Sequence, residues 1–331
     1  MMGQKGMQIQ RIDITDISGI QIGHARDLGA ATGCTVLIAD QGATAGVDVR
    51  GGAPGTRDTD LLNPVNLVDK VHGVVLSGGS AFGLAACSGV MRFLEERDIG
   101  LYTGVARIPI VCGAVLFDLG IGDPAVRPDE AMGYQACLDA GRKPCAQGNV
   151  GAGAGATVGK IWGMERAMKS GLGTCCIETR GLKVGALVAV NSLGDVIDPA
   201  SGAALAGVLS PDRTTILNTE EIMISHFVRQ NIGFVSNTTI GIVITNAALT
   251  KSQATKVASM AHNGYARSIR PAHTMLDGDT LFTVATGQMP ADISVVGMLS
   301  AKAVQQAVIS AVRQADPHLG FPCSRELAMQ P

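Results

Sequence analysis

The chain has 331 residues, of which 46% are hydrophobic, 16% charged and 3% aromatic. That length suffices for one large domain or two ordinary ones, and the scarcity of charge indicates a chain buried in layers or at subunit interfaces. A formal net charge of -2 provides no basic surface for nucleic acid or an anionic membrane, so neither is an expected partner.

No apolar run approaches the roughly 18–20 residues that span a bilayer, and the start of the chain lacks the apolar stretch of a signal peptide. The eight cysteines are widely spread and contain no C-x-x-C pair. This pattern favours small buried thiols over a zinc or disulfide framework. We therefore expect a cytoplasmic protein without a structural metal.

The first half of the chain alternates between strand and helix signals. Residues 34–40 and 70–77 are rich in β-branched side chains and predict strands, and residues 79–96 carry apolar side chains at helical spacing. Residues 120–148 predict a loop with a short helix. The glycine-rich segment 148–160 (GNVGAGAGATVGK) follows.

The second half begins with an apolar strand predicted at 185–191. Residues 210–229 are more polar and predict an exposed connector with a short helix at its end. Residues 238–245 (TTIGIVIT) are almost all apolar or β-branched, which is typical of a strand buried on both faces.

The last elements start at Thr250, which with Gln253 forms the pattern of a capping box opening a helix. A strand is predicted at 281–286 and a long amphipathic helix at 293–312. Doubly buried strands with helices between them fit a parallel doubly wound sheet or a four-layer sandwich, and periodicity alone leaves both open.

Nucleotide motifs fail in the glycine-rich segment. A phosphate-binding loop ending at Lys160 would need glycine at 154 and Ser or Thr at 161, where Ala154 and Ile161 stand. The dinucleotide spacing is broken by Ala156 and Val158. We expect close backbone packing there, and no cofactor.

Two other motifs also fail. Ser80 lies in GGSAFG, a near miss to the nucleophile elbow, and is expected to cap the helix that follows. The six histidines show no metal-ligand spacing, and His262 and His273 are expected to pack or cap.

The Asn237–Thr238 bond lies at the start of the doubly buried strand. If this bond is cut, Thr238 carries a free α-amine beside its own hydroxyl. An α-amine has a reference pKa of about 7.7–8, close to where a general base works best. One residue would then supply nucleophile and base without histidine. The competing interpretation is an ordinary β-branched residue at a strand start.

Six short motifs spread over nearly the whole chain stand out together: residues 12–15 (IDIT), 22–25 (IGHA), 51–57 (GGAPGTR), 76–84 (LSGGSAFGL), 237–243 (NTTIGIV) and 273–280 (HTMLDGDT). Through these motifs the chain resembles the DmpA/NylC family of self-processing N-terminal-nucleophile (Ntn) hydrolases. It most closely resembles the nylon-oligomer hydrolase (NylC) branch, because the aminopeptidase members use serine as nucleophile. The family also includes L-aminopeptidase/D-esterases and β-peptidyl aminopeptidases.

The resemblance implies a four-layer αββα sandwich, similar to Ntn hydrolases but with different connectivity. It implies one domain, 1–331, cleaved into 1–237 and 238–331, which stay associated. It also implies a homotetramer, and the many small apolar residues independently suggest a homo-oligomer. The expected substrate is a small peptide or amide.

The resemblance also assigns roles by position. Thr238 matches the nucleophile, and Asp277 and Asp279 match the acidic pair around it in the nylon-hydrolase branch. Lys160 matches the active-site lysine, and Asn191 matches the asparagine that stabilises the oxyanion. The aminopeptidase branch has serine and glutamate where Asp277 and Asp279 stand, so its recognition of an α-amine does not carry over directly.

The same residues have plainer interpretations. Asp-Gly-Asp at 277–279 is also an ordinary turn before a strand, and Asn191 is an ordinary residue after one. Lys160 would then extend its ammonium to water. Among functions, an aminopeptidase or β-peptidase, an acyltransferase of the ornithine acetyltransferase type, and a non-enzymatic binding protein remain alternatives to an amidohydrolase.

Overall fold

The structure is a computed structural model that describes residues 9–141, 143–226 and 237–328. Its organising element is β3 (Thr32–Val49), an 18-residue strand with a register shift between Ile38 and Ala43. The first half of β3 pairs with β2 (Gln21–Asp27) and β5 (Lys70–Ser77), and its last residues pair with β17 (Thr280–Met289). Ten strands, β3 among them, form one hydrogen-bonded sheet, which folds at the bend in β3 into two halves that pack face to face. We call these halves the first sheet and the second sheet.

Each sheet extends outward from β3, and most neighbouring strands are antiparallel. β15 and β17 are parallel in the first sheet, and β5 and β8 are parallel in the second. The first sheet runs in the order β1 (Gln10–Ile12), β11 (Leu172–Thr179), β12 (Leu182–Asn191), β15 (Thr238–Ala247), β17 and β3, and the second contains β2, β3, β5, β8 (Val111–Val115) and β4 (Thr56–Arg57).

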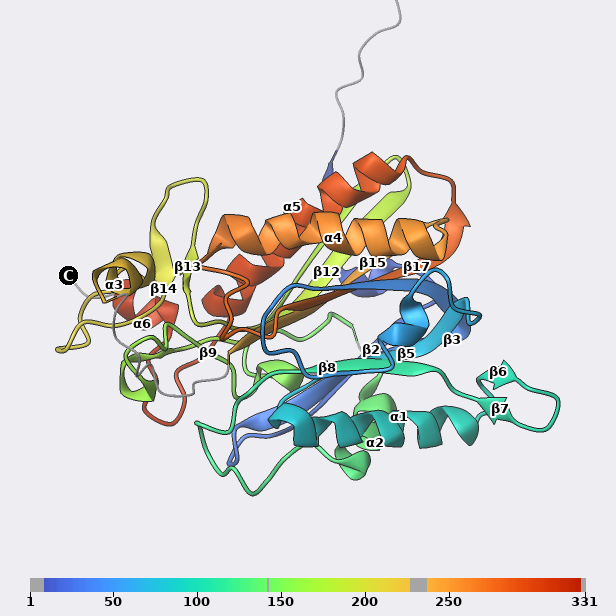
Figure 1. The fold of residues 1–331 in the computed structure, drawn as a ribbon, viewed down its shortest axis with the longest axis horizontal. Helices are drawn as coiled ribbons and strands as arrows, with labels where there is room; N and C mark the ends of the chain where they lie inside the picture. Colours follow the sequence, from blue (N-terminus) through green and yellow to red (C-terminus); the bar gives the residue numbers. More distant parts are fainter. Residues whose placement is uncertain (1–8, 142, 227–236, 329–331) are drawn as a thin grey trace, which may run out of the picture.

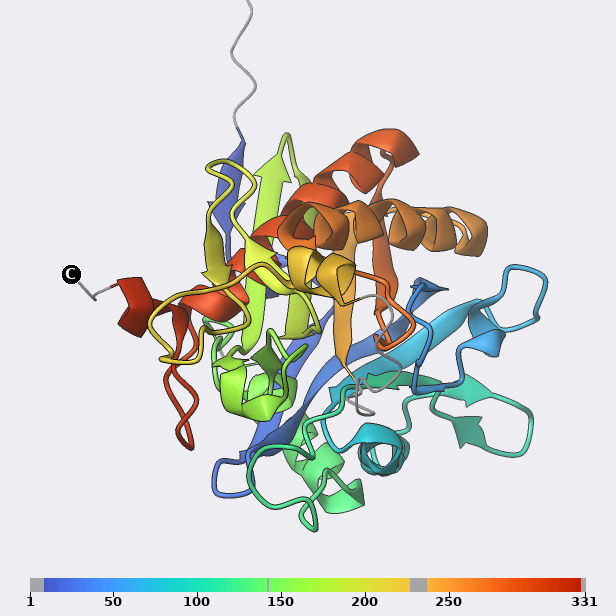
Figure 2. The same cartoon turned by 60° about the vertical axis from the view of Figure 1, so that its left-hand side comes forward.

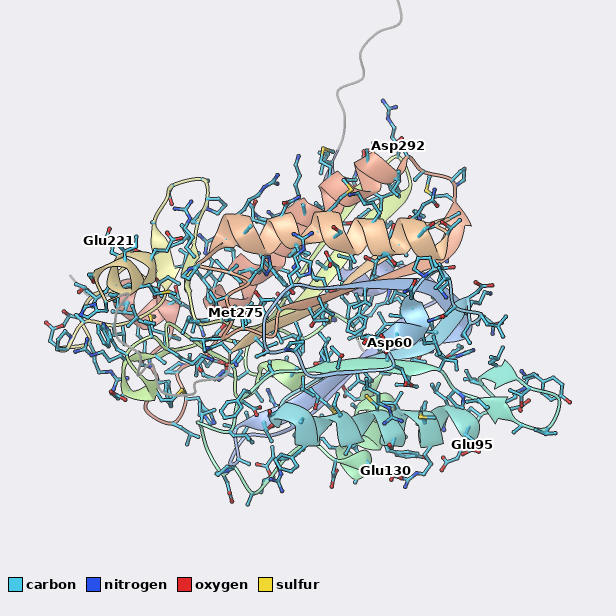
Figure 3. All side chains as sticks on the ribbon, viewed as in Figure 1. Asp60, Glu95, Glu130, Glu221, Met275 and Asp292 are labelled. Atoms are coloured by element: carbon cyan, nitrogen blue, oxygen red, sulfur yellow. The ribbon has the colours of Figure 1, made fainter. Side chains whose placement is uncertain are left out.

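Helices cover the outer face of each sheet. α4 (Lys251–Ser268) and α5 (Ile293–Arg313) lie side by side over the first sheet, and α1 (Ala86–Glu95) and α2 (Glu130–Asp139) lie under the second (Figures 1 and 2). Charged side chains such as Glu95 and Glu130 are exposed on this lower helical layer (Figure 3).

Three apolar clusters separate the four layers. The central cluster joins the two sheets, with Leu37 and Val74 facing Leu187 and Ile242. A second cluster lies between the first sheet and α4 and α5, and a third lies between the second sheet and α1 and α2. The chain is therefore a four-layer αββα sandwich, and the parallel doubly wound alternative is wrong.

The strand β15 confirms the prediction of burial on both faces. All ten of its residues are buried. Ile240, Ile242 and Ile244 enter the central cluster, whereas Val243 and Ala247 enter the cluster under the helices. This alternation follows from the period of two along a strand.

The predicted helix at 79–96 is partly wrong. A 3-10 helix, η3 (Ser80–Ala85), precedes α1, and Gly79 at the cap position has no side-chain capping bond. Ser80 adopts φ 54° and therefore does not cap the helix as expected. The capping box at Thr250 and Gln253 is confirmed at the start of α4.

The expectation that no apolar run approaches the length of a membrane span is wrong for α5. α5 is 21 residues long with a mean hydropathy of 1.4, which passes the length and composition test for a membrane span. Within its most apolar window 67% of the helix is buried in the protein. It packs on α4, β11 and β12, as a core helix of a sandwich does.

The remaining elements are short. The predicted connector 210–229 contains α3, and its residues 227–229 lie outside the described part of the chain. The short elements are η1 (Ile14–Asp16), η2 (Asp60–Leu62), β6 (Leu101–Tyr102), β7 (Arg107–Ile108), η4 (Gly151–Gly153), β9 (Thr157–Val158), η5 (Met164–Arg166), β10 (Met168–Lys169), β13 (Asp195–Ile197), β14 (Ala204–Ala206), α3 (Thr219–Ser225), β16 (Ile269–Arg270) and α6 (Ser324–Ala328).

Candidate active site

The predicted site residues meet at one edge of the first sheet. Thr238, the first residue of β15, is the register partner of Asn191, the last residue of antiparallel β12. On the other side of β15, Asn237 forms a parallel bridge with Asp277, just before β17. Sheet register therefore brings together segments that are distant in the sequence.

Two hydrogen bonds hold the carbonyl of the Asn237–Thr238 peptide in place. The Thr238 hydroxyl donates to the carbonyl oxygen of Asn237, and the N–H of Gly278 donates to the same oxygen at 2.8 Å. A Cβ on Gly278 would lie 2.8 Å from Thr238 Oγ1 and 2.7 Å from the Ala53 carbonyl, so the position requires glycine. Thr238 itself is 2% exposed.

Asp277 is held by three donors and is buried. Its Oδ1 accepts from the backbone N–H of Leu193 at 3.2 Å, and its Oδ2 accepts from the N–H and the hydroxyl of Thr274. Burial, followed by the negative charge of Asp279, raises the pKa of Asp277 to about 6. The carboxyl therefore titrates within the working range of a general acid or base.

Asp279 joins the nucleophile strand to the preceding loop. Its Oδ1 accepts from the N–H of Thr239 at 2.7 Å. Its Oδ2 accepts from the backbone N–H and the Nδ1 of His273, both at 2.9 Å. An ordinary turn explains neither contact, because both carboxylates of Asp-Gly-Asp point inward toward other segments. The loop nevertheless reaches the surface, where Met275 is 79% exposed (Figure 3).

Lys160 is 1% exposed, so the alternative in which it reaches water is wrong. Its Nζ donates to the backbone carbonyl and to the Oδ1 of Asn191, each at 2.9 Å. Burial lowers the pKa of Lys160 to about 7, and the nearby carboxylates of Asp277 and Asp118 oppose that shift. The ammonium therefore exchanges its proton near neutral pH.

Asn191 has every polar atom of its amide engaged. Its Oδ1 accepts from Lys160 and from the N–H of Thr157, while its Nδ2 donates to the carbonyl of Phe117 at 2.8 Å. Asn191 thus lies across from Thr238 with its amide fixed. The donors to the Asn237 carbonyl are instead the N–H of Gly278 and the hydroxyl of Thr238.

The glycine-rich segment packs backbone against backbone, as predicted. A Cβ on Gly153 would lie 2.2 Å from the N atom of Leu172, and one on Gly155 would lie 1.9 Å from the Ala31 carbonyl. In the described residues, no three His, Cys, Asp or Glu side chains are grouped as a metal site would require.

The model of the family described as Peptidase family S58 matches residues 13–323. The chain belongs to peptidase family S58. The family resemblance predicted from the motifs is thus confirmed, and this S58 protein is a hydrolase of the aminopeptidase and amidohydrolase type.

Relatives of this S58 hydrolase carry two kinds of name. This chain is 41% identical to an uncharacterized aminopeptidase of Mycobacterium tuberculosis, over 95% of this chain and 97% of the relative. It is 30% identical to a 6-aminohexanoate-oligomer endohydrolase of Kocuria sp., over 90% of this chain and 85% of the relative.

A solved structure shares the fold. The L-aminopeptidase D-Ala-esterase/amidase from Ochrobactrum anthropi, described as a variant of the Ntn hydrolase fold, matches with a TM-score of 0.69. The match covers 96% of this chain and 91% of that chain at 19% identity. The Ntn-like sandwich is therefore shown for this S58 hydrolase.

Several residues around this S58 site are not indicated by the sequence patterns. The patterns indicate Gly278 only as the middle of a turn, and they indicate no role for Thr157 or Asp118. Asp118 is buried and accepts from the N–H of Gly79 at 2.7 Å, and burial raises its pKa. The expectation that His273 packs is confirmed by its ring contact with His262, and its contact with Asp279 is an addition. The signal for Gly278 is its place between the two acidic residues of the loop.

Proposed function

We propose that this chain is an autoprocessing amidohydrolase in which Thr238 is first the residue at the cleavage site and then the N-terminal nucleophile. One observation carries the proposal: the Thr238 hydroxyl lies against the Asn237 carbonyl, whose oxygen is held by the N–H of Gly278. A nucleophile, an electrophile and an oxyanion donor are thus assembled around one peptide bond.

In the first stage, Thr238 Oγ1 attacks the carbonyl carbon of Asn237, and its proton passes to the Thr238 nitrogen as the C–N bond breaks. The Gly278 N–H stabilises the oxyanion during this step. The product is an ester between Asn237 and the Thr238 side chain. Water opens this ester and leaves a carboxylate at Asn237 and a free amine at Thr238.

In the second stage, the free amine of Thr238 acts as base while Oγ1 attacks a substrate amide. Lys160 and Asp277 supply nearby groups that titrate at about 7 and about 6. Gly278 supplies a backbone N–H to the new oxyanion, and Asn191, the register partner of Thr238, supplies its Nδ2–H once that group leaves the Phe117 carbonyl. Water then hydrolyses the acyl-enzyme, so the reaction needs no organic cofactor or metal ion.

The proposed substrates are short peptides or amino-acid oligomers of the aminohexanoate kind. The printed name of the Kocuria relative supports an oligomer, and that of the mycobacterial relative supports an aminopeptidase or β-peptidase as the second candidate. Turnover on N-terminally blocked against free peptides separates the two candidates, because an aminopeptidase needs the free amine. An added amine acceptor tests for acyl transfer.

Cleavage is tested by intact mass and N-terminal sequencing. The expected fragments are residues 1–237 and 238–331, of about 24 and 10 kDa when the 34.0 kDa mass is scaled by length. The two fragments should copurify, and we propose a homotetramer, which light scattering measures. A small fragment that begins at any residue other than Thr238 would contradict the proposal.

Substitutions isolate the nucleophile. Thr238→Ala should abolish both cleavage and turnover, because it removes the hydroxyl. Thr238→Ser should keep both, because serine supplies the same hydroxyl and amine. Thr239→Ala is the matched control, since Thr239 is equally buried but contacts Asp279 only through its backbone. Wild-type turnover by Thr238→Ala would overturn the assignment.

A further inference from the structure

His273 makes two contacts with one carboxylate oxygen. Its backbone N–H and its ring Nδ1 both lie 2.9 Å from Asp279 Oδ2. Because an ionised carboxylate only accepts, Nδ1 carries the proton and donates. Asp279 Oδ1 accepts from the N–H of Thr239. Both oxygens of Asp279 are thereby fixed, one by His273 and the other by the residue after the nucleophile.

The backbone at His273 is unusual in a way that serves this contact. His273 adopts φ 59°, in the left-handed region that non-glycine residues seldom occupy. Such a conformation persists where the surrounding structure imposes it, and it is concentrated at functional sites. Here it turns the backbone N–H and the side chain of His273 toward the same oxygen.

A second histidine packs against the ring of His273. The rings of His262 and His273 meet edge to face with centroids 4.8 Å apart, and Tyr265 lies beside both. Burial lowers the pKa of His262 to about 4, so this ring is neutral at pH 7. Its Nε2 lies 2.9 Å from the Asp48 carbonyl and donates to it. His262 is therefore anchored and limits rotation of the neighbouring ring.

The position of Asp279 bears directly on the site. Asp279 follows Gly278, whose N–H donates to the Asn237 carbonyl, and its Oδ1 is bonded to the N–H that follows Thr238. A movement of Asp279 would shift the oxyanion donor and the nucleophile relative to each other. A misplacement of about 1 Å at a reacting centre lowers a rate by about 100-fold.

We propose that His273 is a positioning residue for this reaction: its Nδ1–H holds Asp279 so that Gly278 and Thr238 keep their alignment. The inference rests on the proposed function of Thr238. His273 touches neither the substrate nor the reacting atoms in this scheme. Its donor acts through Asp279 on self-cleavage and on substrate turnover alike.

The test compares two amides of similar polarity. His273→Asn places a donor where Nδ1 stands and tolerates the left-handed backbone. His273→Gln places its donor farther out, near the position of Nε2. We expect the asparagine variant to keep cleavage and kcat within about threefold of wild type, and the glutamine variant to lose about 10- to 100-fold in both. KM should change by less than about threefold in each.

A third variant isolates the backbone. His273→Gly permits the positive φ without strain, keeps the backbone N–H donor and has no side-chain donor, so it should behave like the glutamine variant. His318→Gln is the matched control, because His318 is bonded to the Leu28 carbonyl and the proposed site residues make no contact with it. Thermal unfolding of each variant shows whether it is folded, and if the glycine variant is not, the asparagine and glutamine pair still decides.

Two results would overturn the inference. One is equal kcat for the asparagine and glutamine variants, and the other is a change confined to KM. If Thr238→Ala is inactive while all His273 variants match wild type, the positioning role fails and the proposed function stands. If Thr238→Ala stays active, the proposed function itself fails.

Discussion

Two buried lysines of this chain perform opposite tasks. Lys160 is 1% exposed and Lys169 0% exposed, and burial lowers the pKa of each to about 7. Lys160 donates to Asn191 and lies near Asp277 at the candidate site. Lys169 donates only to backbone carbonyls. The same residue type, at the same depth, thus contacts a proposed site residue in one case and only backbone carbonyls in the other.

The partners of Lys169 explain its task. Its Nζ donates to the carbonyls of Gly153, Ala156 and Ser170 at 3.1, 3.0 and 2.5 Å. The first two belong to the glycine-rich segment, whose glycines let backbones approach closely. Lys169 therefore holds the segment that leads to Lys160. Environment, and not residue type, decides which groups each buried lysine contacts.

The largest expected effect is on turnover. Lys160→Met should lower kcat and the self-cleavage rate by about 100- to 1,000-fold, because it removes a fixed charge from a water-poor site. Rates are measured on a peptide substrate and by gel densitometry. A kcat within a few-fold of wild type would mean that Lys160 does not contribute to turnover and does not differ from Lys169 in this respect.

The next effect is on stability. Lys169→Met should lower the free energy of unfolding by about 2–4 kcal/mol, because three buried carbonyls lose their donor. Turnover per folded molecule should stay close to wild type. Urea unfolding in the uncleaved Thr238→Ala background measures the change, with exposed Lys302→Met as control. A large loss of turnover without loss of stability would reverse the assignment.

A smaller effect on stability tests whether Asp118 is a shared counter-charge for Lys160 and Lys169. The carboxylate of Asp118 raises the pKa of both lysines against the effect of burial. Asp118→Asn should therefore destabilise the uncleaved chain by about 1–3 kcal/mol. A double-mutant cycle with Lys169→Met should show a coupling of about 0.5–3 kcal/mol. Strict additivity would mean that Asp118 acts only through its own hydrogen bonds.

The last prediction is a pH slope of the free energy of unfolding. Because the pKa of each lysine is lowered from 10.5 to about 7 on folding, the unfolded chain binds more protons above pH 7. Stability should therefore rise from pH 7 to about 8.5, by up to about 1.4 kcal/mol per pH unit for each lysine. Each lysine-to-methionine variant should lose the part of this rise in stability that its lysine contributes. Urea unfolding at the two pH values measures the loss. Equal slopes in wild type and variants would contradict the lowered pKa values.

Local patterns were sufficient for part of this molecule. The strand at 238–245 was recognised as doubly buried from its run of apolar and β-branched residues, and the capping box at Thr250 needs only four residues. The chemistry expected of Thr238 follows from the amine and hydroxyl that one residue carries. Ser80 shows the limit, because no local pattern indicates its φ of 54°.

The sequence alone determined which segments become strands and helices, which family the motifs resemble, and which residue can be a nucleophile. Only the tertiary structure decided that Asn191 lies opposite Thr238, that Leu193 contacts Asp277, and that Lys160 donates to Asn191. The physical reason is the separation along the chain over which each effect acts. Propensity and periodicity act over a few residues, whereas sheet register and burial bring together groups that the chain separates by tens of residues.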